Sequence, residues 1–197
     1  SFHAVSAETG VQAGPQGSHL PSRTIPMIMT SRPIADSYAE TTHLVLPNDT
    51  NTLGNLMGGQ LLKWLDIACA ISAHRHCKRV VVTVAVNHVS FDRPIKLGDF
   101  VTIRSHVSRA FSTSMEVWAD VWVEDQQTGE KIPCNNAIYT FVAVDNTGRP
   151  LKVAEAVPGN ELEQKRFDGA LRRRQLRLIL GGKMKAEEAT ELKALFE

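Results

Sequence analysis

Residues 58–75, GGQLLKWLDIACAISAHR, are the stretch that decides the fold. Most positions hold leucine, isoleucine, alanine or another apolar or small residue, and charged side chains are confined to Lys63, Asp66 and Arg75. A helix with so little polar surface is expected to be buried. The sequence therefore predicts one long helix in the core of the protein.

Strand patterns stand on both sides of this helix. Before it, Thr42, Leu44 and Leu46 alternate with His43 and Val45, which is the period of two expected of a β-strand. After it come four segments rich in valine, isoleucine, threonine and aromatic residues, with turn sequences such as GD and QQTGE between them: 80–91, 100–109, 112–124 and 134–144. This order predicts an α+β fold, in which a single antiparallel sheet covers one helix.

The two faces of the predicted sheet differ in character. In the segment 112–124, Trp118 and Trp122 fall on one face, whereas Val117, Val121 and Val123 fall on the other. In a monomer, the outer face and at least one edge of this sheet would be left uncovered. Because an uncovered apolar edge strand favours aggregation, we expect the protein to be an oligomer.

The composition changes at both ends of this region. Residues 1–35 begin with a stretch rich in glycine, serine, proline and threonine that shows no sustained apolar period, which predicts a flexible N-terminal arm. Residues 36–149 form the predicted domain. Residues 150–197 are expected to be a linker followed by a helical extension, with helices over 161–180 and 184–196 separated by Gly181 and Gly182.

The charge is balanced overall but not locally. The 197 residues carry 22 lysines and arginines against 21 aspartates and glutamates, a net charge of +1. This balance gives no field that would draw the chain to nucleic acid or to an anionic membrane, and no apolar run approaches the length of a membrane span. Residues 171–185, however, hold six basic residues and no acidic one, so an anionic ligand would meet a local basic cluster.

The cysteines indicate a reducing compartment. Cys69, Cys77 and Cys134 are odd in number, and no signal-peptide pattern precedes them, so we expect the cytoplasm. A zinc site is the alternative, since His74 and His76 lie next to Cys77, but no second ligand pair stands at zinc-like spacing. The prediction is therefore that the protein holds no metal.

The residues suited to chemistry cluster in NDTNTLGNLMGGQLLKWLD, residues 48–66. Gly58 and Gly59 open the predicted helix, where backbone N–H groups without intrahelical partners can stabilise an oxygen that gains negative charge. Asp66 lies about two turns later among apolar residues, where it is either a satisfied structural carboxylate or a functional one. Asn55 could orient a water or a carbonyl, although it could equally be a turn residue, as could Asn48 and Asn51.

Two other kinds of catalytic site are not supported. No G-x-S-x-G sequence marks a serine nucleophile. GNLMGG lacks the Gly-Lys-Ser/Thr that completes a phosphate-binding loop.

Five segments together resemble the hotdog-fold acyl-CoA thioesterases of the cytosolic acyl-CoA hydrolase type: GNLMGGQLLKWLD followed by HRHC, VNHVSFDRPIKLGDFV, RAFSTSMEV and QQTGEKIPCNNAIYTFVA. Their order and spacing match over roughly residues 36–148. The resemblance implies a hotdog fold, in which an antiparallel sheet wraps around one long central helix. It also implies a homodimer joined edge to edge, and in many relatives a trimer of such dimers.

The resemblance assigns catalytic roles to three residues. Gly58 matches the glycine whose N–H binds the thioester carbonyl oxygen. Asp66 matches the catalytic acid, acting as general base or as nucleophile, and Asn55 matches the position that orients the water or the thioester. Each site would combine Asn55 of one protomer with Asp66 of the other. Met57 stands where some relatives carry histidine, so no imidazole would assist here.

The same resemblance implies where coenzyme A binds. Two strand segments would line its channel, Thr83, Val84 and Ala85 in one and Ser112, Thr113 and Ser114 in the other. Arg174 matches an arginine that reaches a CoA phosphate, a task that Arg173 and Arg177 could share. The alternative for these arginines is a solvated helix face. Coenzyme A would be part of the substrate, so no separate cofactor is expected.

Three functions are consistent with these features. The first is hydrolysis of fatty acyl-CoA to fatty acid and CoA. The second is a non-catalytic acyl-CoA sensor, because a fold does not determine a function. The third, a hotdog dehydratase, would need a histidine base, and the loop before the helix does not provide the expected pattern.

Overall fold

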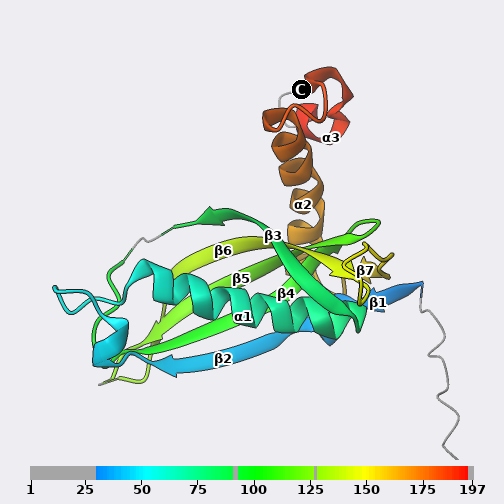
Figure 1. Ribbon diagram of the computed structural model, residues 1–197. Coiled ribbons are helices and arrows are strands. Elements are labelled where there is room, and N and C mark those ends of the chain that lie inside the picture. The colour runs from blue at the N-terminus through cyan, green and yellow to red at the C-terminus, as the bar shows by residue number, and fades with distance from the viewer. Residues whose placement is uncertain (1–29, 91–92, 127, 195–197) are drawn as a thin grey trace, which may run out of the picture.

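The computed structural model describes residues 30–90, 93–126 and 128–194 (Figure 1). Five antiparallel strands form one sheet in the order β2-β4-β5-β6-β3 and curl around the helix α1 (Figure 1). The strands are β2 (Ala39–Leu44), β3 (Val80–Val89), β4 (Phe100–Ala110), β5 (Ser114–Glu124) and β6 (Lys131–Val144). The predicted α+β order of one strand, one helix and four strands is therefore present.

The helix α1 (Gly58–Cys77) forms the centre of the core. Leu61, Leu65 and Ala68 of this helix are at most 1% exposed, because the sheet curls over them. The helix ends at Lys78, whose φ of 54° places it in the left-handed region, and the backbone then turns directly into β3. This turn sets α1 and β3 side by side.

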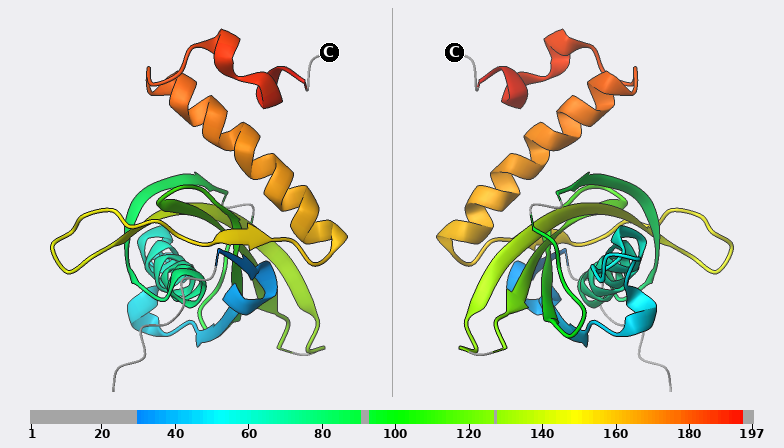
Figure 2. Two further views of the ribbon diagram at one scale, coloured as in Figure 1. Left: turned by 90° about the vertical axis from the view of Figure 1, so that its right-hand side faces the viewer. Right: turned by 90° about the vertical axis from the view of Figure 1, so that its left-hand side faces the viewer.

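The two faces of the sheet contact different helices. Val117, Ala119 and Val121 of β5 are at most 1% exposed and belong to the core around α1. The alternate residues, which include Glu116 and Trp118, contact the helix α2 (Glu161–Leu180). Figure 2 shows α1 inside the curl of the sheet and α2 crossing its outer face. The alternation expected from the sequence therefore separates a core face from a face that contacts the C-terminal helix.

Charged and aromatic side chains attach α2 to the sheet. Arg173 donates to the buried carboxylate of Glu116 at 2.6 Å, and Arg166 pairs with Asp120 at 2.7 Å. Both guanidinium groups also lie near the ring of Trp118: that of Arg166 is 4.7 Å from the ring centroid and that of Arg173 is 5.2 Å from it. Because both pairs are partly shielded from water, they hold the helix more firmly than exposed pairs would.

The segments outside the predicted domain are only partly as expected. Residues 1–29 of the predicted arm lie outside the described residues. Its last residues belong to the fold, because β1 (Ser31–Pro33) pairs in parallel with β7 (Glu155–Val157) and Ile34 of the short helix η1 (Ile34–Ser37) is fully buried. A further short helix, η2 (Pro47–Asp49), lies in the loop before α1.

The end of the chain differs from the prediction in one respect. The first helix of the extension spans 161–180, as expected, but the second, predicted over 184–196, is interrupted. It is replaced by η3 (Ala186–Glu188) and α3 (Thr190–Lys193). The interruption falls at Ala189, whose φ and ψ of −87° and 66° are not helical. No helix in the described part of the chain is both long enough and apolar enough to span a membrane.

One edge of the sheet is open and apolar. The strand β3 lies at the end of the strand order, and it pairs with β6 on one side. Four of its valines are between 43% and 56% exposed: Val80, Val82, Val84 and Val86. The uncovered apolar edge expected from the sequence is therefore β3.

Candidate functional site

The N-terminus of α1 presents unpaired backbone donors. Met57, just before the helix, has extended backbone angles, and its carbonyl oxygen accepts from the N–H groups of Gln60 and Leu61. In the described residues, the N–H groups of Gly58 and Gly59 have no backbone acceptor. A Cβ added at Gly59 would meet no heavy atom within 4 Å. The first turn of α1 can therefore be approached closely by an oxygen atom that carries negative charge.

Asp66 lies further along α1, where the helix passes β3. Its Oδ1 accepts a hydrogen bond from Thr83 Oγ1 at 2.7 Å, and the side chain is neither fully buried nor fully exposed. Burial and, to a smaller extent, the Asp66 charge raise the pKa of the Cys69 thiol. Asp66 is thus held in place by a neighbouring strand while it stays accessible at the open edge of the sheet.

The helix geometry separates Asp66 from Gly58. The two residues are eight positions apart, which corresponds to about 12 Å along the axis of an α-helix. A thioester carbonyl bound at the N–H of Gly58 would therefore not be within reach of Asp66 of the same chain.

Two asparagines of the loop before α1 have different surroundings. The Oδ1 atom of Asn51 accepts from the N–H groups of Leu53 at 2.9 Å and Asn55 at 3.2 Å, which fixes the orientation of its amide. Asn55 is half-buried and lines a cavity of about 320 Å³. From the sequence, Asn51 is only a candidate turn residue, but in the structure its side chain organises the loop.

The predicted CoA-binding residues of β3 lie on the open edge. Thr83 points toward α1 and bonds to Asp66, while Val84 is 54% exposed and Ala85 is half-buried. The pairing with β6 shifts register between Thr83 and Ala85. This bulge at Val84 locally turns the strand and leaves one residue unpaired at the edge.

The second predicted CoA-binding segment, Ser112 to Ser114, forms the turn between β4 and β5. Ser114 is opposite Val142 of β6, and Val142 is opposite Val82 of β3. The turn therefore lies at the same end of the sheet as Thr83, two strands away. The structure brings the two predicted segments into one region but not into direct contact.

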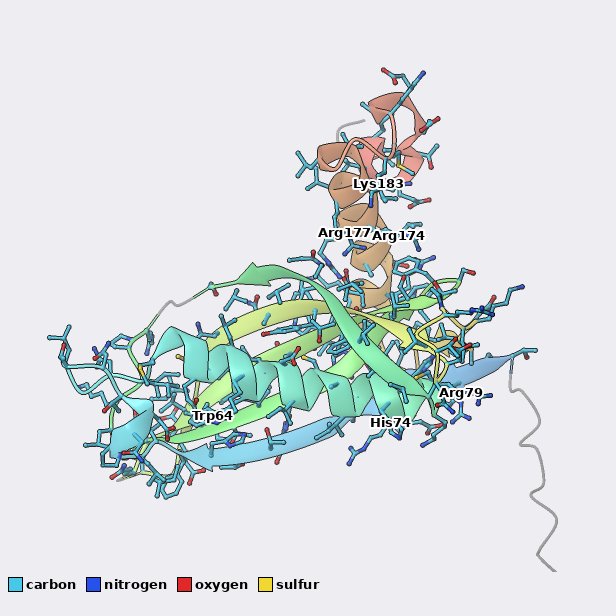
Figure 3. All side chains as sticks on the ribbon, in the orientation of Figure 1. Trp64, His74, Arg79, Arg174, Arg177 and Lys183 are labelled. Atoms are coloured by element: carbon cyan, nitrogen blue, oxygen red, sulfur yellow. The ribbon has the colours of Figure 1, made fainter. Side chains whose placement is uncertain are left out.

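Arg174 reaches the same region from α2. Its guanidinium lies 4.2 Å from the ring centroid of Phe111, immediately before the Ser112 turn. Figure 3 shows Arg174 and Arg177 close together on α2, above the sheet. Burial, followed by the positive charges of Arg177 and Arg109, lowers the pKa of Arg174.

These arginines differ in their partners. Arg173 is bound to Glu116, whereas Arg177 donates to the hydroxyl of Thr140 at 2.7 Å. Arg109 lies over the ring of Phe167 at 4.1 Å. Among the described residues, no carboxylate forms an ion pair with Arg109, Arg174 or Arg177. These three side chains therefore form a cluster of positive charge that can bind an anion.

The residues of the zinc alternative do not converge on one point. His76 is fully buried and its Nε2 bonds to the carbonyl oxygen of Ala154 at 2.8 Å, whereas His74 is exposed and bonds to the carbonyl oxygen of Arg79. In Figure 3 His74 lies at the end of α1 next to Arg79. Within the described ranges, no three histidine, cysteine, aspartate or glutamate side chains are grouped as a metal site would require.

Comparisons with known proteins agree with this fold. Residues 53–130 match the model of the thioesterase superfamily. The acyl-CoA thioester hydrolase YkhA of Bacillus subtilis is 39% identical over 128 residues, which are 65% of this chain and 74% of YkhA. Acyl-coenzyme A thioesterase 11 of Mus musculus is 37% identical over 142 residues, but these are only 24% of that longer protein.

Solved structures extend the likeness to three dimensions. A hexameric acyl-CoA thioesterase superposes with a TM-score of 0.73 at 34% identity, over 76% of this chain and 96% of the other. The acyl-CoA hydrolase of Staphylococcus aureus, in complex with butyryl-CoA, CoA and CoA disulfide, superposes with a TM-score of 0.73 at 29% identity, over 85% and 99% of the two chains.

Three further structures of the S. aureus hydrolase carry single replacements by alanine. An aspartate, an asparagine and a threonine are replaced, one in each variant; the asparagine stands fifteen positions before the aspartate and the threonine seventeen after it.

The curled sheet around α1, the match to the superfamily and the similarity to YkhA over three quarters of its length lead to one conclusion: the chain belongs to the hotdog-fold acyl-CoA thioesterases of the thioesterase superfamily.

Proposed function

We propose that this protein is an acyl-CoA thioester hydrolase, which converts fatty acyl-CoA and water to free fatty acid and CoA. The observation that carries the proposal is the Asp66 carboxylate, held by Thr83 at 2.7 Å on the central helix of a thioesterase fold. The membership of the family and the names of its relatives supply the reaction class. CoA is substrate and product, so the proposal requires no separate cofactor.

In this proposal Asp66 is the general base. It takes a proton from water as the water oxygen attacks the thioester carbonyl carbon. The carbonyl oxygen gains negative charge, which the N–H of Gly58 and the positive end of the α1 dipole stabilise. When the carbon–sulfur bond breaks, the proton returns from Asp66 to the CoA sulfur. The fatty acid and the CoA thiol are then the products.

The loop asparagine that we assign to the site is Asn51 rather than Asn55. Asn51 stands fifteen positions before Asp66, and Thr83 stands seventeen after it. These are the spacings of the three residues replaced in the S. aureus hydrolase. Since two backbone N–H groups occupy Asn51 Oδ1, its amide nitrogen is left to donate to a substrate oxygen. Asn55 lines the adjacent cavity instead.

We further propose that each site is shared by two protomers. Asp66 and Gly58 of one chain are about 12 Å apart along α1, and β3 offers an uncovered edge of exposed valines next to Asp66. If two copies pair antiparallel along β3, the end of the sheet near one α1 N-terminus approaches Asp66 of the partner. Several related structures are hexameric, which supports three such dimers as the complete assembly.

The phosphates of CoA are assigned to the cluster of Arg109, Arg174 and Arg177. These arginines lie at the end of the sheet that also holds the Ser112 turn and the Thr83–Asp66 pair, and no carboxylate in the described residues neutralises them. Positive side chains of this kind suit phosphate groups. Arg173, which sequence reasoning offered for the same task, is bound to Glu116 instead.

The proposal is tested by thiol release from a series of acyl-CoAs. Asp66→Asn removes the base while it keeps the shape of the side chain, and we expect kcat to fall on the order of 100-fold or more. Asp168→Asn, on the outside of α2, is the matched control and should leave the rate unchanged. If the wild-type protein binds acyl-CoA without releasing thiol, it is the non-catalytic sensor instead.

A further inference from the structure

A buried carboxylate on the outer face of the sheet has no role in the proposed chemistry. Glu116 of β5 is 2% exposed, and its Oε1 accepts from the hydroxyl of Ser108 at 2.8 Å and from Nη2 of Arg173 at 2.6 Å. Nε of the same arginine donates to Oε2 at 3.3 Å. A carboxylate is costly to remove from water unless its charge is paired. Glu116 therefore requires Arg173 of α2 at this place on the sheet.

A second contact between α2 and the sheet lies beside the first. Thr140 of β6 is directly opposite Glu116 in the register of the sheet, and its hydroxyl accepts from Arg177 at 2.7 Å. Arg173 and Arg177 are four positions apart, so their Cβ atoms lie on one face of α2 about 5–6 Å from each other. Opposite residues on neighbouring strands have nearly the same separation. A shift of α2 by one residue would therefore break both contacts.

A glycine of α2 makes room for the first contact. Gly169 is buried in the interior of the helix, where glycine is less favourable than alanine. A Cβ at this position would lie 2.6 Å from Nη1 of Arg173. The Arg173 guanidinium thus folds back over Gly169, where it also donates to the carbonyl oxygen of Arg166 at 3.1 Å. The ion pair with Glu116 therefore depends on the lack of a side chain at Gly169.

The two contacts hold like charges together. Burial lowers the pKa of Arg174, and the positive charges of Arg177 and Arg109 lower it further. This repulsion favours any movement of α2 that carries Arg174 and Arg177 away from Arg109 of β4. Beyond these residues α2 leaves the sheet, as Figure 2 shows, and Leu180 near its end is 79% exposed. The contacts at Glu116 and Thr140 therefore oppose this movement when no anion is bound.

We propose that Glu116 is a positioning residue for the binding of CoA: through Arg173 it fixes the register of α2 and holds Arg174 and Arg177 ready for the phosphates. The proposal rests on the proposed function for the identity of the anion. If α2 occupied several registers, only the molecules in the competent register would bind CoA. The apparent Kd would then rise in inverse proportion to their fraction.

The test measures the affinity of the full-length protein for CoA by calorimetry. CoA itself is the probe, so the result does not depend on hydrolysis. Glu116→Gln keeps the shape of the side chain but removes its charge, and we expect the Kd for CoA to rise about tenfold. Glu124→Gln, the same change at the far end of β5, is the matched control and should leave the Kd within about twofold of the wild-type value.

Two further variants distinguish positioning from a general loss of structure. In an Arg174→Gln background, Glu116→Gln should raise the Kd by at most about threefold, because it acts through an arginine that is already absent. Gly169→Ala displaces the Arg173 guanidinium without changing any charge, and should raise the Kd about threefold to tenfold in the wild-type background. Added to Glu116→Gln, it should have little further effect, since the ion pair is already broken.

The outcomes separate this proposal from the proposed function. An unchanged Kd in Glu116→Gln, or a rise that is equally large in the Arg174→Gln background, would overturn the proposal. If Glu116→Gln does not fold, Gly169→Ala decides by the same two criteria. A wild type that hydrolyses no acyl-CoA but binds CoA with an affinity that depends on Glu116 would reject the proposed function and retain this inference. A wild type that binds no CoA would overturn both.

Discussion

The hydroxyl of Thr83 donates a hydrogen bond to the carboxylate of Asp66 at 2.7 Å. This bond joins β3, the open edge of the sheet, to the central helix. The short turn at Lys78 makes it possible, because it sets the start of β3 against the helix that has just ended. The orientation of the proposed base is therefore held by the strand that we expect to form the dimer interface.

Removal of this hydroxyl should slow catalysis without weakening substrate binding. A hydrogen bond to a charged group is worth about 1.5–3 kcal/mol, so Thr83→Val should lower kcat about tenfold or more and leave KM close to that of the wild type. Thr83→Ser keeps the donor and should restore most of the rate. Steady-state thiol release gives both constants. A rise in KM with unchanged kcat would instead assign Thr83 to CoA binding, as the resemblance implied.

The fold was largely predictable because it depends on long, strongly patterned segments. The apolar stretch that begins at Gly58 predicted a helix over 58–75, and the structure extends it only to Cys77. The parallel pairing of β1 with β7 could not be predicted, since each strand has three residues and the two lie more than 120 positions apart. Strands this short carry too few residues for a period to be recognised.

The candidate site is less predictable from the sequence than the fold, for a physical reason. Gly58 and Asp66 are marked by unusual contexts, a glycine pair at a helix start and a carboxylate in an apolar helix. Asn51 and Asn55 share one turn-rich loop, and turn chemistry favours asparagine whether or not it also meets a substrate. The partners of Arg173 and Arg174 depend on how α2 lies on the sheet, which no local pattern encodes.

The two asparagines should respond differently to replacement by alanine. Asn51→Ala removes the proposed donor to the substrate and should lower kcat by about 100-fold or more, since the loss of one donor to a developing negative charge costs about 3 kcal/mol. Asn55→Ala should leave kcat within about threefold, as expected for a residue outside the reacting centre. Circular dichroism spectra of both variants control for loss of the fold. The opposite order of the two rates would return the assignment to Asn55.

Mixed dimers test whether the site is shared. One protomer carries Asp66→Asn and the other Asn51→Ala, each with its own affinity tag. If the two residues act across the interface, one of the two sites in the mixed dimer keeps both intact side chains, so about half of the wild-type kcat should return. Each parent homodimer should remain slow. A mixed dimer as slow as its parents would show that both residues act within one chain.

Stability should fall as the pH drops, and His106 accounts for part of the loss. This side chain is 1% exposed, stacks on Tyr38 and lies against Arg166. Burial and then the charge of Arg166, partly opposed by Asp120, lower the pKa of His106 to about 4. The unfolded chain, with a histidine pKa of about 6.5, binds this proton where the folded chain does not. The contribution is therefore fully present above about pH 6.5 and is lost as the pH falls toward 4.

The size of this effect can be isolated by comparison of two pH values. Between pH 7 and pH 5 the shift of one histidine from 6.5 to about 4 lowers the free energy of unfolding by about 2 kcal/mol. Between the same two pH values, the free energy of unfolding of His106→Gln should fall by about 2 kcal/mol less than that of the wild type, whatever its value at pH 7. Urea unfolding at constant protein concentration gives the values, since an oligomer is also stabilised by concentration. His74→Gln, at an exposed site at the end of α1, is the control and should behave as the wild type. An equal loss of unfolding free energy in the wild type and in His106→Gln would contradict the assignment of the effect to His106.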